Sequence, residues 1–252
     1  MNNSETTSKL KELKLNGMHR MYESLRESRN ADSLSHEEFL SHLVDAEWDD
    51  RFNKKITRLI KNAGFRFKAH IEELTYEKSR KLNKNTVITL SRCDWIPRGN
   101  NLLMTGATGT GKSFLACALG LQACLHLYKV KYVNCMKLFT DLKLAKADGT
   151  YFKEIKQLQK VELLILDDFG LNHLDSESRL FLLEILEDRY GEKATVITSQ
   201  FSVAHWFDII GDKTIADAIC DRFIHNAEKI ELEGDSMRKK KNNSGRNLPL
   251  EK

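Results

Sequence analysis

Residues 106–113, GATGTGKS, have the spacing GxxxxGK[ST], in which glycines are followed by a lysine and a hydroxyl side chain. Glycines let backbone N–H groups surround the oxygens of a triphosphate, the lysine ammonium reaches its β- and γ-phosphates, and the serine hydroxyl binds Mg²⁺. The run NLLM before the motif and the run FLACALGL after it give the strand–loop–helix context that this chemistry needs. The sequence therefore predicts a site for ATP and Mg²⁺, with Lys112 in a catalytic role and Ser113 as a metal ligand. The predicted nucleotide contacts are Gly106, Ala107, Thr108, Gly109, Thr110, Gly111, Lys112, Ser113 and Phe114.

Two acidic residues follow an apolar run in LLILDD, residues 163–168. Four consecutive apolar residues predict a buried strand, which puts Asp167 and Asp168 at the carboxyl edge of the sheet, where ligands bind in open α/β folds. We expect Asp167 to hold Mg²⁺ through its waters and Asp168 to polarise the attacking water. A further strand, TVITSQ, ends in Ser199 and Gln200, and a polar side chain at that position can sense the γ-phosphate.

The elements that position these residues alternate along the chain from about residue 71. This alternation of strands and helices implies parallel βαβ units in an α/β sheet. We predict an ATPase domain over residues 71–240 and a polar, basic tail over 241–252. The expected strands lie at 101–106, 130–134, 161–168, 194–200 and 228–233, and the expected helices at 112–127, 135–147, 151–160, 178–191 and 212–224.

Residues 1–70 are predicted to form a helical N-terminal domain. Apolar positions between residues 8 and 28 have helical spacing, and Ser35 with Glu38 forms a capping box for a long helix that ends at Gly64. A basic stripe follows the other face of this helix, and no acidic residue occurs between its first and last members. Such a stripe is usually a solvated helix face, but the absence of acids favours an anionic partner. The predicted DNA contacts are Arg51, Lys54, Lys55, Arg58, Lys61, Arg66 and Lys68.

The composition sets limits on the class of protein. With 252 residues and 41% hydrophobic side chains the chain can form a substantial core, and its net charge of +4 alone says little about partners. The five cysteines form no CxxC pair, so neither a zinc site nor a disulfide framework is indicated. No apolar stretch is long enough to cross a bilayer, and the first residues lack the apolar middle of a secretion signal. We expect a cytoplasmic protein with no membrane partner.

The order of P-loop, LLILDDFG, VITSQ and DRF resembles that of AAA+ ATPases. Residues 198–239 are more specific, because they resemble the end of IstB-like proteins, the ATP-binding helpers of insertion-sequence transposition. Residues 9–25 resemble the opening helix of that family, so that the likeness covers roughly residues 8–240. It implies an AAA+ P-loop NTPase core, with a parallel sheet flanked by helices, preceded by a small all-helical N-terminal domain.

The resemblance also implies roles for single residues. Arg222, in DRF, matches the arginine finger that reaches the γ-phosphate bound by a neighbouring subunit, and Gln200 matches the sensor position, with Ser199 a second candidate. Arg238 matches a second sensor arginine that contacts the nucleotide. The implied partners are further copies of the chain with ATP at their interfaces, duplex DNA bound without sequence preference, and an IstA-type transposase. Asp168 stands where most AAA+ proteins have glutamate, one methylene longer, so we expect slow ATP hydrolysis.

Three other functions are compatible with a P-loop protein of this size. The first is a DnaC-like helicase loader, which differs in its client and in binding single-stranded DNA. The second is a small-molecule kinase, although the sequence has no clear lid of arginines and a kinase leaves the basic stripe unexplained. The third is a structural DNA-binding protein with an inactive P-loop, which the presence of Lys112, Ser113, Asp167 and Asp168 disfavours. The subunit number, the shape of the bound DNA and the surface that meets a transposase are left open by the sequence.

Overall fold

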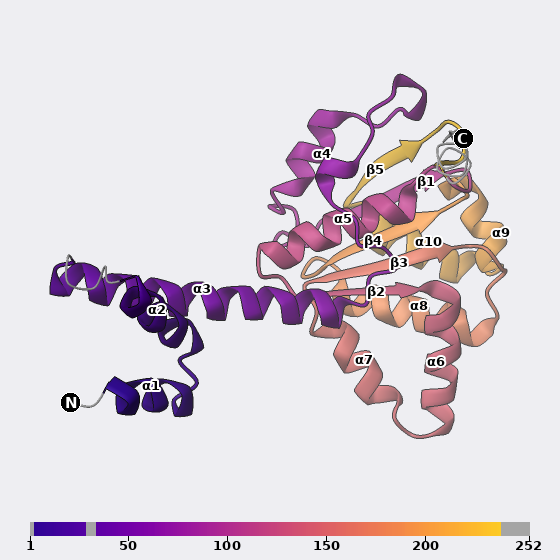
Figure 1. The fold of residues 1–252 in the computed structure, drawn as a ribbon. Helices are drawn as coiled ribbons and strands as arrows, with labels where there is room; N and C mark the ends of the chain where they lie inside the picture. The colour runs from indigo at the N-terminus through magenta and orange to yellow at the C-terminus, as the bar shows by residue number, and fades with distance from the viewer. Residues whose placement is uncertain (1–2, 29–33, 238–252) are drawn as a thin grey trace, which may run out of the picture. The chain divides into compact units, whose positions relative to one another are not determined.

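The computed structural model describes residues 3–28 and 34–237, and Figure 1 shows its ribbon. The chain divides into two compact units, residues 1–58 and residues 59–252. The expected boundary lay at residue 70. The structure instead assigns residues 59–70 to the second unit, because Leu59, Ile60, Phe65 and Phe67 pack against its core. Among the helices of the described ranges, none has the length and apolar character to span a membrane.

The first unit is helical, as predicted. It contains α1 (Asn3–Glu12), α2 (Asn16–Glu27) and the greater part of α3 (His36–Ala63). The predicted capping box is confirmed, since Ser35 N donates to Glu38 Oε2 over 2.8 Å and Glu38 N donates to Ser35 Oγ over 3.2 Å. The helices α2 and α3 approach closely at Gly17, whose backbone N–H donates to the buried carboxylate of Glu47 over 2.8 Å.

The second unit contains the predicted parallel sheet. All strand pairs are parallel and the strand order is β2-β3-β4-β1-β5, so that β1 lies between β4 and β5. Each expected strand is present within two residues of its predicted ends. The strands are β1 (Asn101–Gly106), β2 (Val130–Asn134), β3 (Leu163–Phe169), β4 (Ala194–Ser199) and β5 (Ala227–Leu232).

Helices cover both faces of this sheet, which therefore has two apolar cores (Figure 1). Leu102 and Met104 point into one core and Leu103 into the other, because successive side chains of a strand alternate between faces. The first core is closed by α4 (Lys84–Ser91) and α5 (Lys112–Leu125). The second is closed by α6 (Cys135–Ala147), α7 (Tyr151–Gln159), α8 (Ser176–Arg189), α9 (Trp206–Ile210) and α10 (Lys213–Ile224).

Candidate functional site

The loop between β1 and α5 has the backbone that a phosphate-binding loop needs. Gly106, Gly109 and Gly111 all have positive φ values, +143°, +85° and +97°, which side chains other than glycine rarely adopt. A Cβ atom on Gly106 would lie 2.1 Å from the carbonyl oxygen of Leu232, so substitution there is also excluded sterically. The glycines therefore permit both the turn and its close contact with β5.

Lys112 is the first residue of α5, and its side chain bends back over the loop. The residue is only 5% exposed, and Nζ donates to the carbonyl oxygens of Gly106 over 2.6 Å and of Ala107 over 2.9 Å. Ser113 follows it in the first turn of α5, where the backbone N–H groups of a helix N-terminus favour anions. The predicted lysine and serine thus lie together at the start of α5, next to the loop.

Asp167 is fully buried near the carboxyl end of β3 and is held by two hydroxyl groups. Thr198 Oγ1, on β4, donates to Asp167 Oδ1 over 2.5 Å, and the hydroxyl of Tyr132, on β2, donates to Oδ2. Burial raises the pKa of Tyr132, and its hydrogen bond to Asp167 raises that pKa further, so the phenol stays a donor. Residues from three adjacent strands therefore fix the orientation of this carboxylate.

Asp168 has φ +58°, a left-handed conformation that costs energy for a residue with a side chain. The pairing of β3 with β4 shifts register between Leu166 and Phe169, so two consecutive carboxylates occupy an irregular point of the strand. Asp168 Oδ2 accepts hydrogen bonds from Asn134 Nδ2 over 3.3 Å and from an Nη1 of Arg66 over 3.2 Å. The two acids thus lie at the carboxyl edge of the sheet, as predicted, with different partners.

Thr198 and Ser199, at the end of β4, form hydrogen bonds to residues of β3, whereas the sequence indicated that a polar side chain at this end senses the γ-phosphate. Thr198 binds Asp167 and also accepts the backbone N–H of Asp168 over 3.0 Å. Ser199 is buried, and its hydroxyl donates to the carbonyl oxygen of Phe169 over 3.0 Å. Gln200 is half-buried just after the strand, and its side chain has no hydrogen bond within the described ranges. Its role as a sensor of the γ-phosphate stays a prediction.

Arg80 lies behind the phosphate loop and was not indicated by any sequence motif. The residue is 5% exposed, and its Nη2 donates to the carbonyl oxygen of Thr110 over 2.8 Å, while Nη1 donates to Thr75 O and Oγ1 over 2.7 and 2.8 Å. A Cβ atom on Gly111 would lie 2.7 Å from Nη2. Burial lowers the pKa of Arg80, but an arginine side chain stays protonated at neutral pH. This buried arginine therefore holds the backbone of the phosphate loop in place at Thr110.

We predict that Arg80→Ala weakens ATP binding about tenfold, because Thr110 loses a charged donor of the kind that contributes about 1.5–3 kcal/mol. Titration with a fluorescent ATP analogue measures the change, and thermal unfolding shows whether the fold is kept. Arg98→Ala is the control, since that arginine is exposed in the same unit and has no ion pair in the described part of the chain. Unchanged affinity in a folded Arg80→Ala protein would contradict the prediction.

The last described residues lie on the phosphate loop. Met237 N donates to the carbonyl oxygen of Gly109 over 2.9 Å, and a Cβ atom on Gly109 would lie 2.3 Å from Ser236 Oγ. Arg238, the expected second sensor, lies outside the described residues, so its contact with the nucleotide stays a prediction. Its neighbour Met237 is nevertheless in direct contact with the loop.

Arg222 lies on α10, at the opposite end of the sheet from the phosphate loop. Asn101, the first residue of β1, donates from Nδ2 to the carbonyl oxygen of Phe223 over 3.0 Å, whereas the loop begins at Gly106, the last residue of β1. The strand rises about 3.3 Å per residue, which separates these two points by roughly 16 Å. Arg222 therefore cannot reach a nucleotide bound to its own loop.

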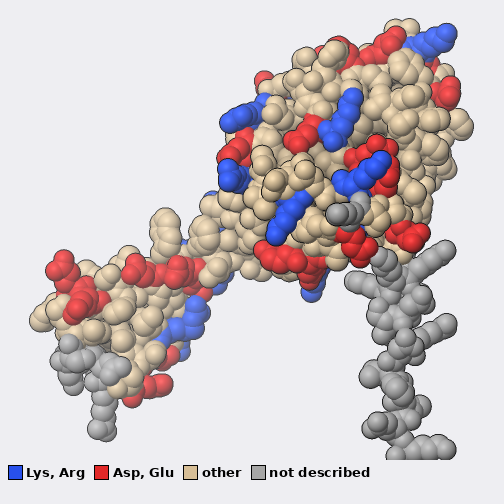
Figure 2. Space-filling model, turned by 90° about the horizontal axis from the view of Figure 1, so that it is seen from above, with Lys and Arg blue, Asp and Glu red and all other residues tan. Residues whose placement is uncertain are grey.

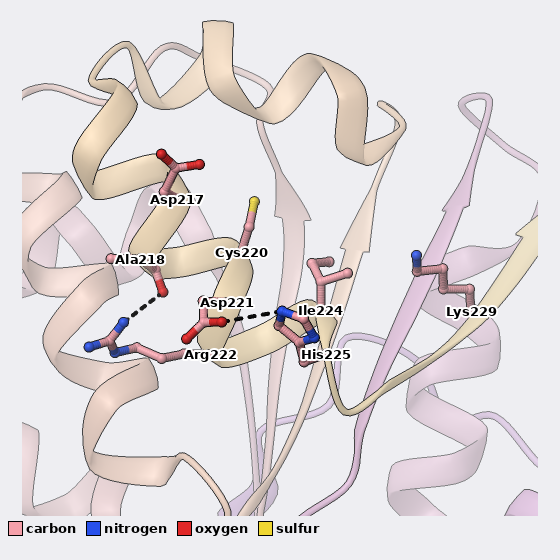
Figure 3. Close-up of a pocket in the computed structure, with 8 residues that line it drawn as sticks. All are labelled: Asp217, Ala218, Cys220, Asp221, Arg222, Ile224, His225 and Lys229. Carbon is pink, nitrogen blue, oxygen red and sulfur yellow. Dashed lines mark hydrogen bonds and ion pairs between the residues drawn. The ribbon is translucent and has the colours of Figure 1, made fainter.

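The side chain of Arg222 has partners within its own chain. Its Nε pairs with Glu187 on α8. Its Nη1 donates to the carbonyl oxygen of Ala218 over 3.1 Å, and nearby Asp221 pairs with His225, whose Nε2 lies 3.2 Å from Asp221 Oδ1. Figure 3 shows these last two contacts in a cavity of the surface. This cavity has a volume of about 770 Å³ and is lined by Asp217, Ala218, Cys220, Asp221, Arg222, Ile224, His225 and Lys229.

The seven predicted DNA contacts are divided between the two units, four in the first and three in the second. Arg51 pairs with Glu47 over 2.7 Å, and Lys54 pairs with Asp50 over 2.6 Å. Although the basic stripe itself contains no acidic residue, these two acids, each four residues before its partner, partly neutralise the charge of the stripe. Figure 2 shows acidic and basic side chains interspersed on the face it presents, rather than one large basic patch. Within the described residues, Lys55, Arg58, Lys61 and Lys68 are exposed and have no ion pair.

Comparison with known proteins gives a consistent result over almost the whole chain. Residues 8–245 match the family model of the IstB-like ATP binding protein. The chain is 43% identical, over 93% of its length and 96% of the relative, to y4pL of Sinorhizobium fredii (strain NBRC 101917 / NGR234), which is named as an insertion sequence ATP-binding protein.

Solved structures resemble the chain in fold. The DnaC helicase loader superposes with a TM-score of 0.56 and 21% identity, over 66% of this chain and 98% of that one. AMPPCP-bound DnaA from Aquifex aeolicus superposes with a TM-score of 0.60 and 22% identity, over 75% of this chain and 59% of that one. The predicted AAA+ P-loop fold is confirmed by these likenesses.

Proposed function

Because the chain belongs to the family of IstB-like ATP-binding proteins, we propose that it is an ATP-hydrolysing assembly factor for transposition. In this proposal it oligomerises on duplex DNA in the cytoplasm and recruits a transposase of the IstA type. ATP hydrolysis then loosens the assembly. The observation that carries the proposal is the separation of Arg222 from the phosphate loop of its own chain, since a finger arginine placed there serves only the nucleotide of a neighbouring copy.

The donor groups at the site suit magnesium and a triphosphate. Asp167 and Ser113 offer a carboxylate and a hydroxyl, and oxygen donors of this kind are those that Mg²⁺ prefers. When bound, Mg²⁺ neutralises charge on the phosphate oxygens. Lys112 binds the β- and γ-phosphates, Tyr132 and Thr198 hold the Asp167 carboxylate in place, and Asp168 accepts a hydrogen bond from the attacking water.

Binding to DNA is proposed to depend on many weak contacts rather than on one strong patch. The exposed basic residues of α3 and of the segment after it contact phosphates, which carry no sequence information. One copy binds weakly, because two residues of the stripe are partly neutralised by Glu47 and Asp50. An assembly that aligns many copies along one duplex binds far more tightly through avidity.

Particle size tests this function most directly. We expect light scattering and electron microscopy to detect large assemblies only when ATP and duplex DNA are both present, and to detect smaller particles at higher salt. A single-stranded DNA of equal length is the matched comparison. Preferred assembly on the single strand would favour a helicase loader, and particles whose size is independent of nucleotide would contradict the proposal.

A further inference from the structure

The segment GFRFK, residues 64–68, holds an arginine over the acid pair. Phe65 packs into α5 so closely that a Cβ atom on Gly120 would lie 2.6 Å from its ring, and Phe67 packs against Phe114 with ring centroids 6.2 Å apart. Both phenylalanines are half-buried, whereas Arg66 between them is exposed. The two aromatic anchors thus fix the segment on α5 and leave Arg66 at the site.

The guanidinium of Arg66 contacts both predicted functional carboxylates. Its Nη1 lies 3.2 Å from Asp168 Oδ2 and 3.7 Å from Asp167 Oδ2, and its Cζ lies 5.4 Å from the ring centroid of Phe67. Burial acts to lower the pKa of Arg66, but Tyr132 and the two aspartates outweigh it and the pKa is raised. The side chain is therefore a permanent cation in contact with the acid pair.

A cation in this position opposes the chemistry expected of the two acids. It competes with a divalent cation for Asp167, and its hydrogen bond occupies one of the two Asp168 oxygens that can accept a hydrogen bond from water. Nevertheless, the Arg66 side chain is 43% exposed, so its ion pair is of the kind that contributes little and can be exchanged for another anion.

We propose that Arg66 forms an inhibitory ion pair with Asp167 and Asp168, and that a phosphate of duplex DNA releases it by binding the guanidinium. This inference rests on the proposed function and adds a regulatory contact to it. Arg66 and Asp168 line one cavity of about 920 Å³, whose other charged lining residues are Lys131, Lys137, Asp141, Asp148 and Glu154. The Arg66 guanidinium can bind a phosphate in a bidentate manner, and the two lysines add positive charge beside the acids of the cavity. DNA binding and ATP hydrolysis are thereby coupled within one subunit.

The test compares Arg66→Gln with the parent in the full chain. We expect the DNA-free rate of ATP hydrolysis to rise about two- to fivefold, the change expected from losing one partly exposed ion pair. The Mg²⁺ concentration that half-saturates binding of a fluorescent ATP analogue should fall by a similar factor. Duplex DNA should stimulate ATP hydrolysis by the parent and should change the variant rate less than about twofold. The control is Arg92→Ala, which replaces an exposed arginine at the end of α4 and should behave as the parent does.

Arg66→Met, of similar length, is the second variant should Arg66→Gln fail to fold, and the same results are expected of it. A folded variant with a parental or lower DNA-free rate and an unchanged Mg²⁺ requirement overturns the inhibitory ion pair. That outcome leaves the proposed function standing as long as the parent assembles on duplex DNA with ATP. A parent that does not assemble refutes the proposed function instead, whatever Arg66→Gln does to hydrolysis.

Discussion

Lys112→Ala is expected to lower the affinity for ATP by at least about 100-fold and to abolish ATP-dependent assembly on duplex DNA. The Lys112 ammonium is buried at the phosphate loop and is the cation next to the predicted phosphates. Two charged hydrogen bonds to phosphate contribute about 3 kcal/mol or more, which corresponds to about 100-fold in affinity. Titration with a fluorescent ATP analogue and light scattering with duplex DNA measure the two effects.

The control for this variant is Lys153→Ala, because Lys153 is exposed on α7 and forms no ion pair in the described ranges. We expect it to bind ATP and to assemble as the parent does. Thermal unfolding of both variants separates loss of binding from loss of fold. A folded Lys112→Ala protein that assembled on DNA as readily as the parent, with or without ATP, would refute the role of nucleotide in assembly.

The second large effect is expected from mixing two inactive variants. In the proposed mechanism, Asp168→Asn removes the charge that orients the attacking water, and Arg222→Ala removes the cation supplied to the neighbouring copy. Each is expected to reduce the rate of ATP hydrolysis by about 100-fold or more. In an equal mixture, an Arg222→Ala copy offers an intact loop and acids, and an adjacent Asp168→Asn copy offers an intact arginine. About one quarter of the interfaces in a random head-to-tail assembly then contain both intact parts, so the mixture should recover about one quarter of the parental rate.

This recovery distinguishes action between copies from any role within one chain. An arginine that served only its own fold, for example through Glu187, would give a mixture no more active than its components. The same negative result would follow if Arg222 acted on nucleotide in its own subunit, which the geometry of β1 already opposes. The control is an equal mixture of Arg98→Ala and Asp168→Asn. This mixture should have about half of the parental rate, because half of the copies lack the Asp168 carboxylate while every copy keeps Arg222.

The local features of the fold could be predicted from the sequence, because short-range patterns determine them. Apolar runs located all five strands, and the glycine spacing located the loop before α5. Two helices, α4 and α9, were not predicted, since their eight and five residues are too few for a clear apolar period. The order of strands in the sheet was not predicted either, because it depends on packing between elements distant in the chain.

The same distinction applies to the site. Lys112, Ser113, Asp167 and Asp168 belong to contiguous motifs and could be identified directly. Thr198 and Tyr132 are ordinary strand residues in the sequence, and they gain a role only because β2, β3 and β4 are neighbours. The contact of Arg66 with DNA stays a prediction, and its hydrogen bond to Asp168, 102 residues further along the chain, could not be foreseen from the sequence. Arg80 lies in no motif, and its contact with Thr110 could not be foreseen without the fold.

The placement of the phosphate loop and Arg222 at opposite ends of β1 gives any head-to-tail array a direction. The surfaces that meet between copies are unlike each other, so an open array exposes a phosphate loop at one terminus and an arginine at the other. If Arg222 acts as proposed, the nucleotide in the terminal loop would lack the cation that speeds its hydrolysis and would outlive the nucleotide in the interior. Growth at that terminus would preserve an ATP cap, whereas a closed ring would have no protected end and all its sites would hydrolyse ATP alike.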